Sequence, residues 1–257
     1  MKDLLLFDVD GTLTVPRNKI SDDMVEVLKN ISNNKKCDIG FVGGSNLEKQ
    51  LEQIGKENFY LFKHRFSENG LLYYKNEELI ATQKFSNYLG EDIFKELINI
   101  CLFVLSQIDY KIKRGTFIEY RNGLINVSPI GRGCSQEERD EFYKYDLDNN
   151  IREKMINEIK ERWINYLKSN NLDLDRYELN FSIGGQISVD IFPVGWDKTY
   201  CLKFIDNLYD KIYFFGDKTS KGGNDYEIYN HERVIGNSVK TYNDTINILN
   251  DLIQTKF

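Results

Sequence analysis

LLLFDVDGT, residues 4–12, is the segment of this chain that most clearly indicates its fold class. An apolar run without alternation is typical of a strand covered on both faces, as in a parallel sheet between helices. Asp8 and Asp10 follow this run two residues apart, so we expect their side chains on the same side. Gly11 permits a sharp turn. Because ligands of open α/β sheets bind beyond the carboxyl ends of strands, the stretch also predicts a site there.

Two further apolar runs have the same character, each followed by a glycine: residues 39–42 and 212–215. Helical patterns follow the predicted strands or precede the last of them: residues 22–31, 46–54 and 198–208. Asp197 stands where the N-cap of the third helix is expected. This order of strands and helices predicts an α/β protein with a Rossmann-like parallel-sheet core.

The middle of the chain has a different character. Long charged helical patterns cover residues 91–107 and 137–167, and strand-like patterns cover residues 116–120 and 186–192. We therefore expect residues 83–192 to form an inserted α+β cap domain. Residues 1–82 and 193–257 together are expected to form the core domain.

Composition excludes several classes of partner and site. The chain has 257 residues, and its net charge of −6 gives no general attraction to nucleic acid or to an anionic membrane surface. The apolar run before Asp8 is too short for a signal peptide or a membrane span, so we expect a cytoplasmic protein. Four cysteines without C-x-x-C spacing and two histidines make a zinc site or a disulfide framework improbable. Carboxylates must therefore bind any metal.

Two neighbouring carboxylates repel each other unless they share a cation, and a hard ion such as Mg²⁺ suits Asp8 and Asp10. A calcium-binding EF-hand does not fit, because the glycine of its loop would place Leu6 at the first ligand position. Asp217 offers a further carboxylate in a glycine-rich segment after residues 212–215, although a solvated turn is the alternative there.

Two other positions near predicted strand ends have both a functional and a structural interpretation. Ser45, in Gly43-Gly44-Ser45, could contribute to an anion site at a helix N-terminus or could simply cap that helix. Lys198 could hold a transferring phosphoryl group or could be a solvated lysine at the start of a helix.

Arginines are frequent in the middle segment of this acidic chain. Arg121, Arg132 and Arg139 lie there with Arg114, and guanidinium groups can grip phosphate oxygens in a fork. The alternative is that they form surface ion pairs. Local sequence does not decide between these two interpretations.

Asp-x-Asp-Gly-Thr after an apolar strand resembles the haloacid dehalogenase superfamily, and the order of nucleophile, hydroxyl, lysine and acid along the chain is similar to it. The resemblance implies that Asp8 attacks phosphorus to form an aspartyl phosphate. It also implies that Asp10 is the general acid and base, that both bind Mg²⁺, and that Ser45 and Lys198 take part in catalysis.

Residues 126–139, 181–202 and 214–228 resemble the eukaryotic phosphomannomutases more specifically. The resemblance implies interconversion of mannose 6-phosphate and mannose 1-phosphate, activation by a hexose 1,6-bisphosphate, supply of GDP-mannose synthesis, and a homodimer formed through the cap. Asp217 would join Asp8 and Asp10 around Mg²⁺. The residues expected to bind the sugar phosphate are Arg17, Arg121, Arg132, Arg139, Ser188 and Asp190.

Two other functions stay open at this point: a sugar phosphatase of the same superfamily, and a noncatalytic phosphate-binding domain. Mannose and glucose are not distinguished either, because these epimers differ in the direction of one hydroxyl. Position 231 has a histidine where the family tends to have an acid, so no second cation site is predicted.

Overall fold

The computed structural model describes residues 2–33 and 36–256, and it confirms the predicted α/β fold class with a parallel-sheet core. The chain divides into two compact units. One contains residues 1–82 and 195–257, and the other contains residues 83–194. The chain thus returns to the first unit at Gly195, close to the expected position of residue 193.

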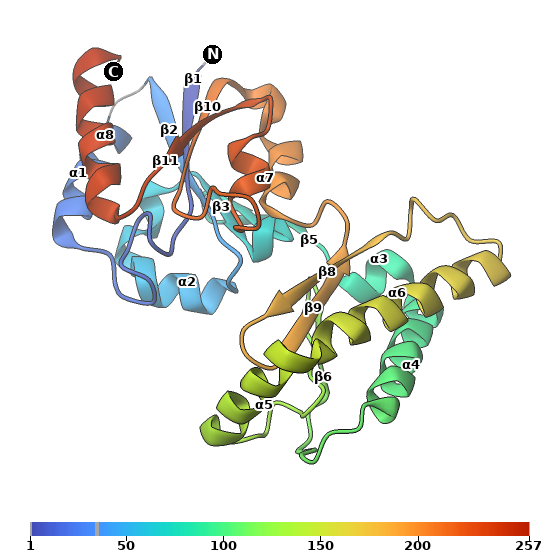
Figure 1. Ribbon diagram of the computed structural model, residues 1–257. Helices are drawn as coiled ribbons and strands as arrows, with labels where there is room; N and C mark the ends of the chain where they lie inside the picture. The colour runs from blue at the N-terminus through green and yellow to red at the C-terminus, as the bar shows by residue number, and fades with distance from the viewer. Residues whose placement is uncertain (1, 34–35, 257) are drawn as a thin grey trace. The chain divides into compact units, whose positions relative to one another are not determined.

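The first unit is built on a seven-stranded sheet of order β11-β10-β1-β2-β3-β4-β5 (Figure 1). The strands from β11 to β3 are parallel, whereas β4 and β5 are antiparallel additions at one edge. The strands are β1 (Lys2–Phe7), β2 (Cys37–Val42), β3 (His64–Ser67), β4 (Leu72–Lys75), β5 (Glu78–Thr82), β10 (Tyr209–Gly216) and β11 (Val234–Ser238).

Helices cover both faces of this sheet, which explains the apolar runs of its central strands. Leu5 and Phe7 of β1 pack in one apolar cluster with residues of α1, α2 and α8. Leu4 and Leu6 belong to a second apolar cluster on the other face of the sheet. Figure 1 shows α1 and α8 side by side on one face and α7 on the other. The α-helices are α1 (Asp22–Ser32), α2 (Leu47–Ile54), α8 (Tyr242–Thr255) and α7 (Tyr226–Tyr229). Short 3-10 helices are η1 (Lys56–Leu61) and η2 (Glu68–Gly70).

The prediction of a single helix over residues 198–208 is wrong. The structure has two 3-10 helices there, η3 (Lys198–Phe204) and η4 (Asp206–Leu208), although Asp197 does cap the first by accepting from the Thr199 amide. Lys198 is held at one end by two ion pairs, and Ile205 is fully buried between the two helices. Tertiary contacts at both ends therefore override the local helical preference.

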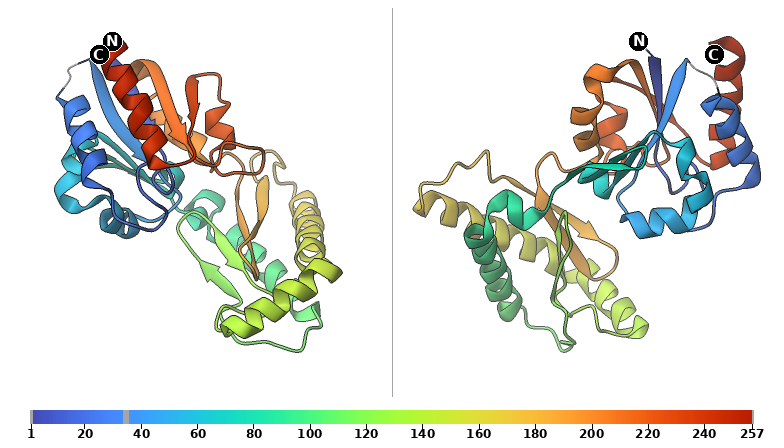
Figure 2. Two further views of the ribbon diagram at one scale, coloured as in Figure 1. Left: turned by 60° about the vertical axis from the view of Figure 1, so that its left-hand side comes forward. Right: turned by 180° about the vertical axis from the view of Figure 1, so that it is seen from behind.

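The second unit is an antiparallel four-stranded sheet with helices, in the order β6-β7-β9-β8. Helices α4 and α6 pack against each other and against this sheet (Figure 2). The strands are β6 (Ile118–Tyr120), β7 (Ile125–Val127), β8 (Leu179–Gly184) and β9 (Ser188–Pro193). The helices are α3 (Phe85–Leu89), α4 (Glu91–Gln107), α5 (Gln136–Asn149) and α6 (Ile151–Ser169).

The helical pattern over residues 137–167 is divided between α5 and α6. Asn150 separates them in the left-handed conformation (φ 53°), which asparagine tolerates better than most residues. Asp146 accepts hydrogen bonds from the backbone N and the Nε of Arg152, so the bend is closed by a buried ion pair. No helix in the described ranges has the length and apolar character that crossing a membrane requires.

A buried polar chain joins four strands of the first sheet. His64 Nδ1 lies 2.8 Å from the hydroxyl of Tyr73, and Nε2 lies 2.5 Å from the hydroxyl of Tyr209, which donates to Asp38. Because the Tyr209 hydrogen goes to Asp38, Nε2 must be the protonated nitrogen and Nδ1 must accept from Tyr73. Burial lowers the pKa of His64 to about 4.

We predict that His64→Gln weakens the acid sensitivity of the fold. Unfolded histidine gains a proton below pH 6.5, whereas folded His64 does so only near pH 4, so stability is lost as the pH falls through this window. The loss amounts to about 3 kcal/mol at most. Urea unfolding of both proteins at about pH 7 and about pH 4.5 measures it. An unchanged pH dependence in the variant would contradict the prediction.

Candidate active site

A pocket of the first unit lies where β1, β2 and β10 end. The residues that line it come from the loops after these strands and from α2. They are Asp8, Val9, Asp10, Gly43, Gly44, Ser45, Gln50, Gln53, Asp217, Lys218 and Asn224. The carboxyl ends of three parallel strands thus meet at one polar cavity, where ligands of open α/β sheets bind.

A buried cluster of charges closes the base of this pocket. Lys198 Nζ donates to Oδ1 of Asp8 and, at 2.5 Å, to Oδ1 of Asp225. Each of the three side chains is nine-tenths or more buried, and the lysine is 1% exposed. Such a group is stable only when its charges are paired, because an isolated buried charge costs several kcal/mol. Two carboxylates therefore position the lysine amine.

Asp225 serves as the anchor of this lysine. Its second oxygen, Oδ2, accepts from the backbone amide of Lys218 at 3.0 Å, so both oxygens are already used. Asp225 is 0% exposed and does not line the pocket. Gly216 is required beside it, because a Cβ there would lie 2.7 Å from the Asp225 carboxyl carbon.

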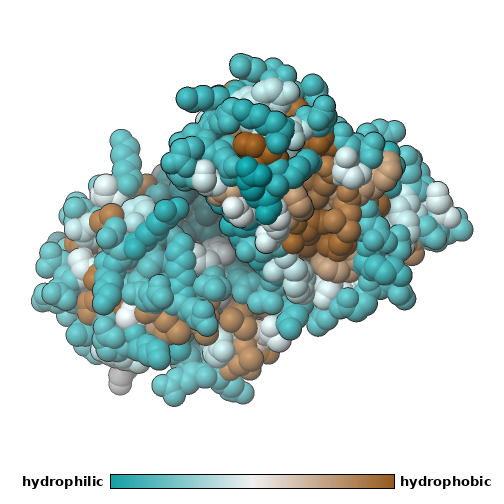
Figure 3. Space-filling model, turned by 90° about the horizontal axis from the view of Figure 1, so that it is seen from below, coloured by the Kyte–Doolittle hydropathy of each residue, from teal (hydrophilic) through white to brown (hydrophobic). Residues whose placement is uncertain are grey.

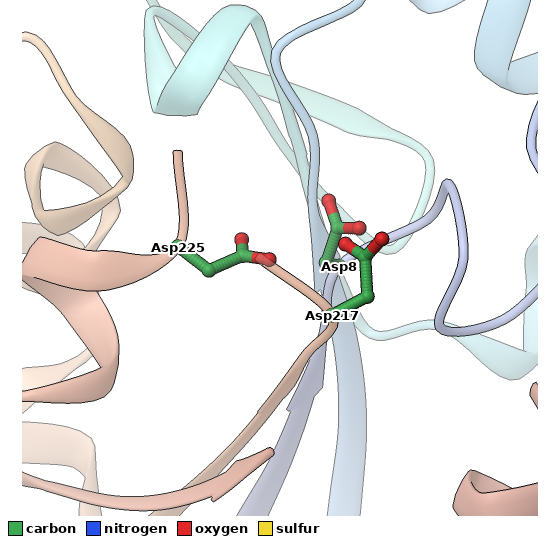
Figure 4. Close-up of side chains that lie close together, drawn as sticks. All are labelled: Asp8, Asp217 and Asp225. Atoms are coloured by element: carbon green, nitrogen blue, oxygen red, sulfur yellow. The ribbon is translucent and has the colours of Figure 1, made fainter. Parts of the chain in front are cut away.

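Asp8, Asp217 and Asp225 form a group whose ligand oxygens lie within 4.8 Å of one another (Figure 4). Asp8 and Asp217 are the two members that face the pocket. Asp217 rests against the turn at Gly11, where a Cβ would lie 2.5 Å from its Oδ2 and where φ is +84°. Clustered carboxylate oxygens are the donors that Mg²⁺ prefers, so the residues present fit this ion.

The electrostatics of the two pocket carboxylates favour a cation. Burial raises the pKa of Asp8 to about 7; Lys198 opposes this rise and Asp225 adds to it. Burial, followed by repulsion from Asp225, also raises the pKa of Asp217. A divalent ion between them would favour both ionised forms.

Asp10 has a different environment, and its carboxylate does not belong to that group of three. Oδ1 accepts from the backbone N of Arg17 and from Gln53 Nε2, each at 2.7 Å. Burial raises the pKa of Asp10, but these hydrogen bonds and the charge of Lys49 outweigh it, so the pKa lies below the ordinary value. With Oδ1 held by two donors, Oδ2 is the oxygen left to exchange a proton.

Ser45 lines the pocket with Gly43 and Gly44. It does not cap the helix that follows, because Asn46 is the N-cap of α2 and accepts from the amide of Lys49. The helix-cap interpretation of Ser45 is thus excluded, and Ser45 lines the same cavity as Asp8 and Asp10.

The second unit brings five of the six expected sugar-phosphate residues into one network. Glu119 Oε2 accepts from Arg121 Nε at 3.0 Å and pairs with Arg132 Nε at 3.1 Å. Arg139 donates to the backbone O of Arg132 at 2.8 Å. Ser188 and Asp190 join through Asn126, as described below. The sixth residue, Arg17, belongs to the first unit, where its backbone binds Asp10.

Sequence reasoning missed several residues that hold the predicted ones. Asp225 anchors Lys198, Gln53 orients Asp10, and Asn126 links the cap residues. Asp225 stood in the glycine-rich segment after Asp217, so a second acid there was a usable signal. No local pattern singles out Gln53, because its partner lies 43 positions away.

Comparison with known proteins identifies relatives along most of the chain. The family model described as eukaryotic phosphomannomutase matches residues 24–255, a span that starts after Asp8, Asp10 and Arg17. Phosphomannomutase of Dendrobium officinale is 52% identical over 94% of this chain and 90% of that protein. Phosphomannomutase of Saccharomyces cerevisiae is 50% identical over 97% of this chain and 93% of that protein.

Solved structures share the fold at low identity. Plasmodium falciparum IMP-nucleotidase has a TM-score of 0.63 at 17% identity and covers 100% of this chain and 63% of that one. Trehalose-6-phosphate phosphatase of Aspergillus fumigatus has a TM-score of 0.58 at 13% identity and covers 99% and 93%. Both likenesses agree with the predicted fold class.

We predict that Asp8→Asn stabilises the protein in chelator at about pH 8. The folded pKa of Asp8 is raised from 3.8 to about 7, so this group's contribution to stability is present at low pH and is lost as the pH rises through 7. Asparagine keeps an oxygen for Lys198 without the charge. The melting temperature should rise by about 2–4 °C or more.

Magnesium provides the second readout of this prediction. It should raise the melting temperature of the wild type and have much less effect on Asp8→Asn, which lacks one carboxylate of the site. Asp251→Asn, at an exposed position of α8, is the matched control and should behave like the wild type. A variant that melts lower than the wild type in chelator and responds fully to magnesium would contradict this assignment.

Proposed function

This chain belongs to the eukaryotic phosphomannomutase family, as its sequence predicted, and on that premise we propose that it interconverts mannose 6-phosphate and mannose 1-phosphate. The observation that carries the proposal is the buried Asp8–Lys198–Asp225 cluster at the base of a pocket that also contains Asp10 and Asp217. It supplies an oriented carboxylate nucleophile with a cation beside it.

Asp8 is the proposed nucleophile. Lys198 holds its Oδ1, which leaves Oδ2 to attack phosphorus of a hexose 1,6-bisphosphate. The new bond joins Oδ2 to phosphorus, the bond from phosphorus to the sugar oxygen breaks, and Asp10 Oδ2 gives that oxygen a proton. The products are an aspartyl phosphate and a hexose monophosphate.

The reverse transfer completes the isomerisation. Asp10 takes the proton of the free hydroxyl of mannose 1-phosphate, and the oxygen at position 6 attacks the aspartyl phosphate to restore Asp8 and form the 1,6-bisphosphate. The bisphosphate then turns end for end, and the phosphoryl group at position 1 is transferred to Asp8. General acid and base assistance of this kind contributes roughly 10²–10⁴ in rate.

Several groups would stabilise charge on the transferred phosphoryl group. Lys198 Nζ lies beside Asp8, and the Ser45 hydroxyl and the backbone at Gly43–Gly44 belong to residues that line the same pocket. We assign a magnesium site to the side chains of Asp8 and Asp217 and to the backbone O of Asp10, which leaves Asp10 Oδ2 for proton transfer. When bound, the ion would offset negative charge on the phosphoryl oxygens.

The cap arginines are the proposed site for the phosphate at the other end of the sugar. Arg121, Arg132 and Arg139 are partly exposed side chains within one network, and Arg17 is exposed in the first unit. A mutase needs such a second phosphate site because either phosphate of the bisphosphate must fit it. A sugar phosphatase needs only the first.

We predict that the wild type converts mannose 1-phosphate to mannose 6-phosphate when a hexose 1,6-bisphosphate and Mg²⁺ are supplied, with little inorganic phosphate released. Correct positioning makes this possible, because effective molarities of about 10⁵–10⁸ M outweigh the ~55 M of water. Asp8→Asn should have no turnover, and Asp10→Ala should lose about 10²–10⁴ in kcat. Parallel assays of both products measure the partition. Release of phosphate as the main product would instead assign a phosphatase.

We also propose that the protein is a homodimer formed through the cap. Figure 3 shows apolar side chains gathered in one region of the face drawn there. In the second unit, Leu102 and Phe103 of α4 are 50% and 46% exposed, and β6 is an edge strand whose Tyr120 is 47% exposed. Exposed apolar surface of this kind is typical of an interface between subunits.

Leu102→Lys should convert the dimer to monomers in sedimentation experiments, because it places a charge in the proposed apolar contact. Leu79→Lys is the matched control, since Leu79 is 48% exposed but belongs to the first unit. A dimer that survives Leu102→Lys and dissociates in Leu79→Lys would place the interface elsewhere.

In the cell, we place this enzyme in the cytoplasm, where mannose 1-phosphate would supply GDP-mannose synthesis. All four cysteines are buried and unpaired, which suits a reducing compartment.

A further inference from the structure

Asn126 occupies the centre of the polar face of the cap sheet. It lies on β7 directly opposite Asp190 of β9 on one side and Glu119 of β6 on the other. The alternate residues Ile125 and Val127 are fully buried on the opposite face, among the apolar residues of the unit. Asn126 itself is only 3% exposed. A buried amide in a strand requires partners for all its polar atoms.

Three partners satisfy this amide. Nδ2 donates to Asp190 Oδ1 at 2.6 Å and to Ser188 Oγ at 2.9 Å, and Oδ1 accepts from Arg132 at 2.8 Å. A carboxylate only accepts and a guanidinium only donates, so the two ends of the amide cannot be exchanged. Asn126 is therefore held in one orientation, and it contacts three of the proposed sugar-phosphate residues.

The position between Asp190 and Arg132 has a particular physical consequence. These are opposite charges, and without a group between them they would attract each other into a direct ion pair. The carboxylate would then no longer be free to accept from a sugar hydroxyl, and the guanidinium would lose donors needed for phosphate. A neutral amide binds both groups and keeps them apart.

We propose that Asn126 is a positioning residue that separates Asp190 from Arg132, so that Asp190 binds a hydroxyl of the sugar while Arg132 binds its phosphate. This inference rests on the proposed function, because it concerns the same sugar phosphate. It assigns to Asn126 no contact with the reacting atoms. Asp190 Oδ2 and the remaining N–H groups of Arg132 are the atoms that it leaves available.

Arg152 holds the backbone around Ser188, one of the partners of Asn126. Its Nη1 donates to the backbone O of Gly185 at 2.9 Å and reaches those of Gly184 and Ser188 at 3.4 Å. Ser188 Oγ donates in turn to Gly184 O at 3.1 Å. The turn that leads into β9 is thereby held, and Ser188 offers Asn126 an acceptor at a defined place.

Asn126→Ala and Asn126→Asp test the proposal in the full-length protein. The KM for mannose 1-phosphate should rise roughly tenfold to hundredfold in both variants, the range in which a displacement of about 1 Å acts, with a smaller change in kcat. The Kd for mannose 6-phosphate, measured by calorimetry, should rise by a similar factor. Asn180→Ala is the matched control, because Asn180 shares this face on β8 and makes no side-chain hydrogen bond to these residues.

The pH dependence of Asn126→Asp separates positioning from a packing role. The new carboxylate would face Asp190, with Arg132 as the nearest cation and Glu119 beyond it. Two adjacent carboxylates raise the pKa of one of them, and the protonated form can donate to the other. The KM of Asn126→Asp relative to the wild type should therefore fall as the pH is lowered from about 8 to about 6, whereas the ratio for Asn126→Ala should stay constant.

The outcomes are distinct. A wild type without turnover contradicts the proposed function, and the Kd ratios still report on Asn126. Unchanged KM and Kd in both variants, with wild-type turnover intact, would overturn the positioning role. Melting curves show whether a variant is folded. A well-folded Asn126→Asp whose raised KM does not depend on pH would also contradict the positioning role of Asn126.

Discussion

The ion cluster of Asp8, Lys198 and Asp225 is the interaction on which the rest of the site depends. Lys198 is 190 positions from Asp8 and 27 positions from Asp225 along the chain. Asp8 and Asp225 come close together because β1 and β10 are neighbours in the sheet. Burial makes the cluster costly unless all charges are paired. The fold therefore brings Asp8, which we propose as the nucleophile, together with the amine that orients it and the anchor of that amine. That arrangement opposes stability locally, since two carboxylates share one lysine.

The sheets of the two units differ in where their polar side chains lie. The first unit has a sheet covered on both faces, and its pocket lies at the carboxyl ends of β1, β2 and β10, where carboxylates that suit a cation gather. The second has a sheet with one apolar face and one polar face, which offers a row of charged and amide side chains: Glu119, Asn126 and Asp190.

The strands of the core sheet could be predicted from the sequence, because an apolar run without alternation indicates a strand buried on both faces. Residues 4–7 form a strand because both of their faces are buried, and the same rule holds for residues 39–42 and 212–215. The sequence prediction was wrong for the helix over residues 198–208, because contacts of Lys198 outweigh the local preference. Gln53 and Asn126 were not found, since each is defined by a partner distant in sequence. Asp225 was also not assigned, although the second acid in its glycine-rich segment was a usable signal. Their roles become visible only once the sheets are assembled.

Identification of the phosphorylated residue decides whether Asp8 is the nucleophile. The wild type, incubated with a hexose 1,6-bisphosphate and Mg²⁺, can be treated with borohydride, which reduces an aspartyl phosphate to homoserine. Mass spectrometry of the peptides then locates the change. We predict homoserine at position 8 only, and none when Mg²⁺ is removed. Modification at another residue, or turnover without any modification at Asp8, would contradict it.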